Sequence, residues 1–189
     1  MARVRVVTLS RQLASGGDVL AEALSVRLGW RCLGRDIIDA AARASGAAEA
    51  ALADIDELNL LGIRPSKTAR QAYRRAVEAI IRDVAAQGWV IIVGRGSQVV
   101  LQREPSALHL KVIAPIECRL RYLMAHEHLD EETAINRIVA SDRARAGYLR
   151  RQYGVHWLDP QLYHMMLNVD PEDLSWVQEV IIRAIEVRV

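Results

Sequence analysis

The feature that most constrains this chain is a run of apolar residues, 89–93, that leads directly into Gly94-Arg95-Gly96. A strand that is apolar at every position is typical of a parallel sheet covered on both faces. A charged residue at the end of such a strand is costly unless it meets a partner or faces a cleft. The run therefore predicts a buried central strand with a charged side chain at its carboxyl end, where that side chain meets a partner or faces a cleft.

Strand-like and helix-like segments alternate along the rest of the chain. This alternation predicts an α/β fold, a three-layer sandwich in which a parallel sheet of about five strands is flanked by helices. In sheets of this kind, ligands bind at the carboxyl ends of the strands. Further strands are predicted over 4–9, 31–34, 108–113 and 165–169, and helices over about 19–28, 36–45, 66–87, 115–126, 130–140 and 174–185.

Length and composition exclude several classes of protein. The 189 residues, of which 51% are hydrophobic and 25% charged, predict a single globular domain spanning 1–189. No apolar run reaches the roughly 18 residues of a membrane span. The net charge of +2 neither favours nor excludes nucleic acid. Cys32 and Cys118 are isolated in the sequence, which favours a reducing, cytoplasmic setting.

Residues Ser10 to Asp18 form a turn of mostly small residues between the first strand and its helix. Backbone N–H groups and the helix dipole make such a junction an anion site. Against the phosphate-binding pattern G-x-x-x-x-G-K-[ST], Arg11 replaces the first glycine, Gly17 the lysine and Asp18 the Ser or Thr. Taken alone, this segment favours an ordinary strand-to-helix turn over a phosphate site.

Arginines mark two other segments. Arg95 is either paired with an acid across the sheet edge or a clamp for a phosphate group. Residues 137–151 contain five arginines, with Asp142 as the only acid, and their helical pattern fades after Ala140. That segment can be a solvated helix face, a mobile cover that closes over phosphates, or a contact for RNA.

Together and in this order, the segments resemble the cytidylate kinase-like family, a branch of the P-loop nucleoside monophosphate kinases, over nearly the whole chain. Thr8 to Gly17 resembles the family's degenerate P-loop, with Ala14 in place of its first glycine. Val93-Gly-Arg-Gly96 resembles its Gly-Arg-Asp monophosphate site, with Gly96 in place of the aspartate. The other matching segments are 33–38 after the second strand, 141–148 and 153–160 in and after the lid, and 163–168 in the last strand.

The resemblance implies ATP-dependent phosphoryl transfer to a nucleoside monophosphate, most readily CMP or dCMP, with ATP and Mg²⁺ as cofactors. It also implies an acceptor-side helical insertion over about 36–87 and a lid over about 140–157. Alanine makes up nine of the residues 40–53, so little apolar area anchors this part of the insertion and we expect it to move.

Roles for individual residues follow from the same resemblance. The backbone amides of Ala14, Ser15, Gly16, Gly17 and Asp18 would hold the donor phosphates. Asp36, Arg95 and Gly96, with Arg74 or Arg70, would bind the acceptor. Arg11, Arg143 and Arg145 would stabilise the charge on the transferred group, with Arg11 in place of the missing lysine. Mg²⁺ would be held by Asp18 or Asp36, or by Asp142.

The missing lysine keeps a second hypothesis open, a non-catalytic nucleotide- or phospho-ligand-binding protein of the same fold. A kinase for another small hydroxylated metabolite and an RNA-binding protein follow in that order. In the first two cases the partners are nucleotides, and neither a membrane nor a nucleic acid is expected. The sequence makes no prediction of the oligomeric state.

Overall fold

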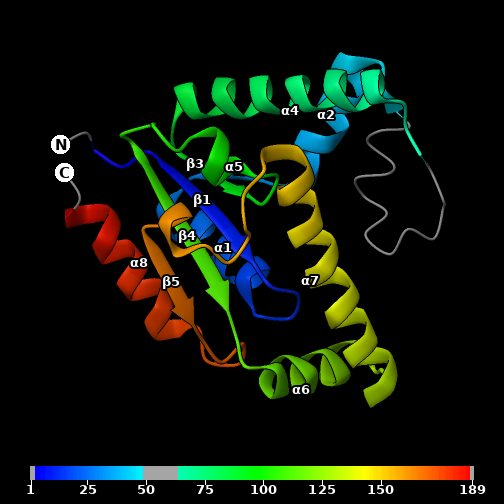
Figure 1. Ribbon diagram of the computed structural model, residues 1–189. Coiled ribbons are helices and arrows are strands. Elements are labelled where there is room, and N and C mark those ends of the chain that lie inside the picture. The colour runs from blue at the N-terminus through cyan, green and yellow to red at the C-terminus, as the bar shows by residue number, and fades with distance from the viewer. Residues whose placement is uncertain (1–2, 49–63, 188–189) are drawn as a thin grey trace.

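The computed structural model describes residues 3–48 and 64–187, and it is built around one parallel sheet (Figure 1). The five strands lie in the order β2-β3-β1-β4-β5, and every neighbouring pair is parallel. The predicted fold class is therefore confirmed. The strands are β1 (Val6–Arg11), β2 (Arg31–Leu33), β3 (Val90–Val93), β4 (Ala107–Ile113) and β5 (Met165–Asn168).

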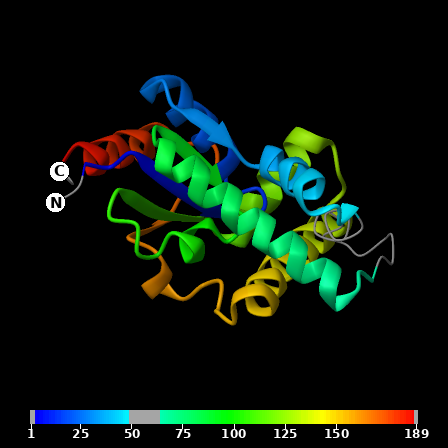
Figure 2. The same ribbon diagram turned by 90° about the horizontal axis from the view of Figure 1, so that it is seen from above.

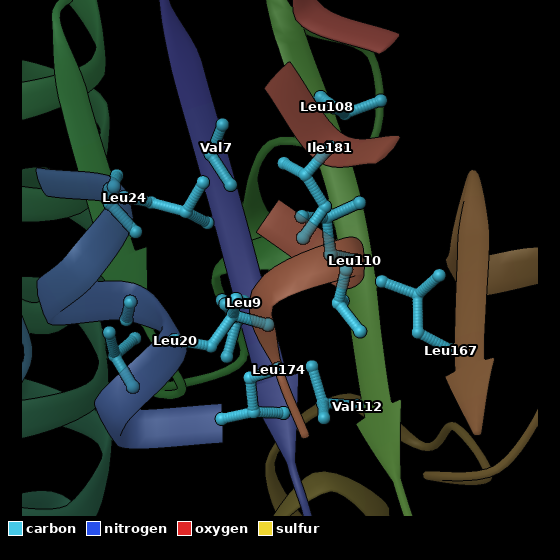
Figure 3. Packing of buried hydrophobic residues seen from close by; sticks show 14 of the residues in the cluster. Val7, Leu9, Leu20, Leu24, Leu108, Leu110, Val112, Leu167, Leu174 and Ile181 are labelled. Atoms are coloured by element: carbon cyan, nitrogen blue, oxygen red, sulfur yellow. The ribbon is translucent and has the colours of Figure 1, made fainter. Parts of the chain in front are cut away.

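Helices cover both faces of the sheet, which explains why its central strands are apolar at successive positions. Successive side chains of a strand point to opposite faces. One face packs on α1 (Gly17–Leu28) and α8 (Ser175–Val187), and Figure 3 shows Leu20, Leu174 and Ile181 against Leu9 and Leu110. The other face packs on α2 (Arg35–Ser45) and α4 (Lys67–Gln87). Figure 2 shows α4 and α8 on opposite sides of the sheet.

The connections after β1 and β3 leave the sheet toward opposite faces. The chain turns into α1 after β1, and into α5 (Ser97–Val100) on the other face after β3. Neighbouring parallel strands whose connections diverge leave a crevice at their carboxyl ends. The two motifs singled out in the sequence, residues 10–18 and 94–96, therefore meet at one edge of the sheet.

One helix continues to Tyr153, which corrects the predicted end of this helix near residue 140, and residues 154–157 of the expected lid are not helical. Helix α6 (Ile116–Glu127) leads into α7 (Glu131–Tyr153), which runs without a break to a C-cap at Gly154. The apolar stripe fades because most of the later residues of α7 are exposed or half-buried, although Leu149 is buried. A short 3₁₀ turn, η1 (Pro160–Leu162), follows before β5.

Two of the predicted helices begin at a side chain that caps them. The Ser66 side chain accepts a hydrogen bond from the backbone N–H of Ala69 at 3.1 Å, and Asp130 accepts one from Thr133 at 2.9 Å. The later part of the alanine-rich stretch 40–53 and the residues that follow it up to 63 lie outside the described residues. Over the described ranges, no helix combines the length and the apolar character needed to cross a membrane.

The core between β4 and the helices α1 and α8 should set the stability of the fold. Leu110 is fully buried there, so Leu110→Ala should lower the free energy of unfolding by about 2–5 kcal/mol. Val139→Ala, at a position on α7 with 48% exposure, should change it by less than about 0.5 kcal/mol. Denaturant unfolding of both variants measures the contrast, and equal losses would contradict this assignment of the core.

Candidate phosphate-binding site

The turn between β1 and α1 has the backbone of an anion cradle. Ala14 and Gly16 have left-handed φ values of 57° and 76°, and Ser15 between them is anchored by a 2.9 Å hydrogen bond from its Oγ to the Gln12 carbonyl. Within the described residues, no protein acceptor binds the backbone N–H groups of residues 14–18. Successive N–H groups in such a turn, at the N-terminus of a helix, attract an anion.

The side chain of Arg11 fills the space beside residue 17, where the lysine side chain of a P-loop would begin. A Cβ atom on Gly17 would lie 2.5 Å from the Cβ of Arg11, so residue 17 has room only for glycine. The Arg11 guanidinium donates to the Asp18 carboxylate at 2.9 Å. It also reaches the second motif, because a Cβ on Gly94 would lie 3.2 Å from its Nη1. The structure thus places a cation at the cradle, on β1 instead of α1.

The turn after β3 consists of three consecutive left-handed residues, Gly94, Arg95 and Gly96, with φ values of 73°, 58° and 69°. Holding arginine in this region costs roughly 1–2 kcal/mol, and such strain clusters at functional sites. A Cβ on Gly96 would lie only 2.4 Å from the Tyr153 ring. The aspartate of the Gly-Arg-Asp motif therefore has no room here, because Tyr153 from the end of α7 fills that space.

Two cavities meet at Arg11 and Arg95, which line both of them. The smaller cavity, about 50 Å³, lies under α7 and is also lined by Ser10, Arg145 and Trp157. The larger, about 520 Å³, lies between the start of α1 and α2 and is also lined by Asp18, Glu22, Cys32 and Arg35. Glu22 and Arg35 were not among the site residues predicted from the sequence, although Arg35 lies in the matching segment 33–38 next to Asp36.

The predicted site residues divide into two groups. The cradle residues 14–18, Arg11, Arg95, Gly96 and Arg145 all lie at this edge of the sheet. The side chain of Arg74 instead donates to the Gln152 carbonyl at 2.8 Å and so ties α4 to the end of α7. The others, Arg70, Asp36 and Arg143, are exposed and do not line either of these cavities.

Asp142 is bound by protein donors on several sides. Its carboxylate accepts from the backbone N–H of Leu13 at 3.1 Å and from Arg119 at 2.7 Å. Arg119 in turn donates to the Leu13 carbonyl at 3.1 Å. The pair is largely buried and joins α6, α7 and the cradle. Asp142 therefore fits a positioning role better than the Mg²⁺ role also expected for it.

A buried polar cluster under the smaller cavity was not anticipated. Ser10 Oγ accepts a hydrogen bond from Trp157 Nε1 at 2.9 Å and lies 3.3 Å from Lys111 Nζ. The same amine sits 3.2 Å from the centroid of the Trp157 ring, and Tyr163 donates to the Trp157 carbonyl at 2.8 Å. Burial lowers the pKa of Lys111 to about 6 and raises that of Tyr163 to about 12. The sequence signal that could have pointed to this cluster was Lys111 itself, one of only two lysines in the chain, because it lies within an apolar strand.

Asp18 is the predicted Mg²⁺ ligand that fits. Among the described residues, no three His, Cys, Asp or Glu side chains gather as a metal site. Mg²⁺ in nucleotide sites, however, is held by one or two carboxylates together with phosphate oxygens. Asp18 follows the cradle directly and lines the larger cavity, so it can supply such a carboxylate. Asp36 is exposed and lines neither cavity.

A five-stranded parallel sheet in this strand order, flanked by helices on both faces, is the three-layer architecture of the P-loop kinases. The model of the cytidylate kinase-like family matches residues 6–171, and the chain belongs to that family. A cytidylate kinase from Sulfolobus acidocaldarius is 27% identical over 73 residues, which make up 37% of this chain and 40% of that enzyme. The match thus spans less than half of the relative.

Solved structures support the fold. An uncharacterized protein from Eubacterium ventriosum has a TM-score of 0.77 at 19% identity, covering 96% of this chain and 98% of its own. A shikimate kinase from Bacteroides thetaiotaomicron has a TM-score of 0.54 at 13% identity, covering 98% and 97%. At this level of identity, the likeness extends to the architecture alone.

The contact between Gly96 and Tyr153 can be tested with a matched glycine. Gly29 has nearly the same φ, 67°, but a Cβ there would meet nothing within 4 Å. Gly29→Ala should therefore cost only the backbone strain, roughly 1–2 kcal/mol of unfolding free energy. Gly96→Ala should cost roughly 1–3 kcal/mol more, because the ring must move. Denaturant unfolding measures both. The excess should vanish in a Tyr153→Ala background, and equal costs at the two glycines would contradict the packing.

The buried Lys111 should make stability depend on pH. Between about pH 6 and pH 10 the unfolded chain binds a proton on this lysine that the folded chain does not, so stability rises with pH in this window. Lys111→Met should remove this pH dependence. Its gain in melting temperature over the wild type should be largest near pH 6–7 and should shrink toward pH 10. Lys67→Met, at the exposed start of α4, is the control. Parallel pH profiles of melting temperature for Lys111→Met and wild type would contradict the burial of an amine.

Proposed function

We propose that the protein transfers the γ-phosphoryl group of Mg·ATP to a nucleoside monophosphate, with CMP or dCMP as the acceptor. One observation carries the proposal: Arg11 and Arg95 line both cavities. Phosphoryl transfer requires two sets of phosphates to face one another across positive charge. Membership of the cytidylate kinase-like family supports the choice of acceptor. Two free cysteines suit the reducing, cytoplasmic setting that we propose with it.

In this mechanism the N–H groups of residues 14–18 bind the donor phosphates, and Arg95 with Arg35 binds the acceptor phosphate in the larger cavity. An oxygen of the acceptor phosphate attacks the γ-phosphorus, and the bond from that phosphorus to the β,γ-bridging oxygen breaks, which releases ADP. Arg11 and Arg145 stabilise the charge on the transferred group. When bound by Asp18, Mg²⁺ would neutralise charge on the donor phosphates. Arg143 would join them only if α7 moved, since it is exposed here.

A non-catalytic nucleotide- or phospho-ligand-binding protein remains the second candidate. The ion pair between Arg11 and Asp18 favours it, because the cation nearest the cradle is already partly neutralised. The missing lysine favours it as well, since fixed cations at the transferred group contribute a large part of phosphoryl-transfer rates. This candidate predicts saturable binding of CMP or ADP with no product.

The assay is phosphoryl transfer from Mg·ATP to CMP, dCMP, UMP, AMP and GMP. Product is expected with CMP or dCMP, and Arg11→Ala should lower kcat roughly a hundredfold or more. Arg183→Ala, an exposed arginine on α8 with 74% side-chain exposure, should leave the rate unchanged. Binding without product for every acceptor would establish the second candidate instead.

A double variant tests whether Arg11 replaces the P-loop lysine. Arg11→Gly removes the side chain that blocks residue 17, and Gly17→Lys then places a lysine at the usual position. The double variant should recover part of the activity lost in Arg11→Ala. Gly17→Lys alone should instead destabilise the protein. A double variant no more active than Arg11→Ala would show that Arg11 does not substitute for that lysine.

A further inference from the structure

We propose that Lys111 is a further cation of the phosphate site, presented from beneath the smaller cavity, and that an oxyanion entering that cavity draws a proton onto its amine. The inference rests on the part of the proposed function that brings phosphate groups to this cavity. It does not require that phosphoryl transfer occurs.

The position of Lys111 follows from the register of the sheet. Ser10 and Lys111 are partners in the pairing of β1 with β4, and partners in a ladder project from the same face of the sheet. Ser10 lines the smaller cavity and lies 3.3 Å from the Lys111 amine. One hydroxyl group therefore links the amine to the cavity. The other lysine of the chain, Lys67, lies exposed at the start of α4.

The burial and the charged groups around Lys111 disfavour its charge in the absence of an anion. Its side chain is fully buried. The guanidinium groups of Arg11, Arg119 and Arg145 oppose protonation, and among the charged groups that act on it only the Asp142 carboxylate favours it. Tyr163 and Trp157 cover the amine from the segment after α7, and His109 precedes it on the same face of β4. An amine in this setting avoids the cost of burial by staying neutral.

A phosphate group would reverse this balance. Arg11 and Arg145 both line the smaller cavity and both repel a proton on Lys111. An oxyanion bound between them adds negative charge on the cavity side of Ser10, which favours the protonated amine. The Trp157 ring, 3.2 Å away, would then hold the ammonium through a cation–π contact. A lysine that only filled space beneath the sheet edge would not respond to an anion.

The presence of only two lysines makes the test direct. In protein labelled with ¹³C-lysine, NMR resolves the ε-methylene signals, and Lys67→Met assigns them. A pH titration of the full chain is then run alone, with saturating sulfate and with saturating CMP. Sulfate does not titrate in this range, so any change reports on the protein.

We expect the Lys111 signal to titrate near pH 6 in the protein alone and its midpoint to rise by at least one pH unit with either anion, a roughly tenfold gain in proton affinity. The Lys67 midpoint should not move. A Lys111 midpoint that is unchanged at saturation, or that already lies near 10 without anion, would overturn the proposal. So would the failure of both anions to bind.

The outcome is separable from that of the kinase assay. A rising Lys111 midpoint without product from any acceptor would establish the anion-coupled lysine and reject catalysis. Product with a stationary midpoint would keep the kinase and reject the role of Lys111. Lys111→Met, which retains volume and removes the amine, should weaken sulfate binding relative to Lys67→Met, and equal affinities would contradict the proposal as well.

Discussion

The side chain of Arg11 lies across the Cα atom of Gly17, and the arrangement of the site depends on this contact. Because residue 17 has no side chain, an arginine at the end of the central strand can extend over the first turn of α1. Its guanidinium then reaches Asp18 on one side and Gly94 on the other. The guanidinium group of Arg11 therefore extends from β1 and lines both cavities. Arginine also brings a planar fork with several donors, which can contact two groups at once.

Close packing against a glycine also determines how α7 lies over the site. Tyr153 fills the place of the aspartate missing at Gly96, so the end of α7 packs directly on the turn that carries Arg95. Arg74 fixes that end of α7 to α4, and the buried pair of Arg119 and Asp142 fixes its middle to the cradle. Removing one partner of such a pair leaves an uncompensated buried charge, which costs about 3–5 kcal/mol. Movement of α7 would therefore require an incoming ligand to replace these contacts.

The fold was predictable because its signals are local, whereas the site depends on which side chains meet in space. Apolar runs and cap residues located β1, β3, α4 and α7, and the resemblance of residues 93–96 brought out Arg95. The apolar pattern could not show that α7 continues past residue 140, since most residues there are exposed or half-buried and the apolar stripe ends. Nor could it show that Asp36 and Arg143 face solvent, or that Asp142 binds Arg119 across 23 residues. Lys111 carried a signal in its unusual place within an apolar strand, but its partner Ser10 is 101 residues away.

The charges of the site explain why a buried lysine can persist beside it. Arg11, Arg95 and Arg145 surround a small cavity, and Asp18 and Asp142 offset part of their charge. A permanently charged ammonium under the same cavity would add repulsion and desolvation that Asp142 and the Trp157 ring offset only in part. A neutral amine avoids both costs and remains able to accept a proton when negative charge arrives. Under the proposal above, a protonated Lys111 on β4 would then add positive charge to that of Arg11 and Arg145 when an anion occupies the smaller cavity.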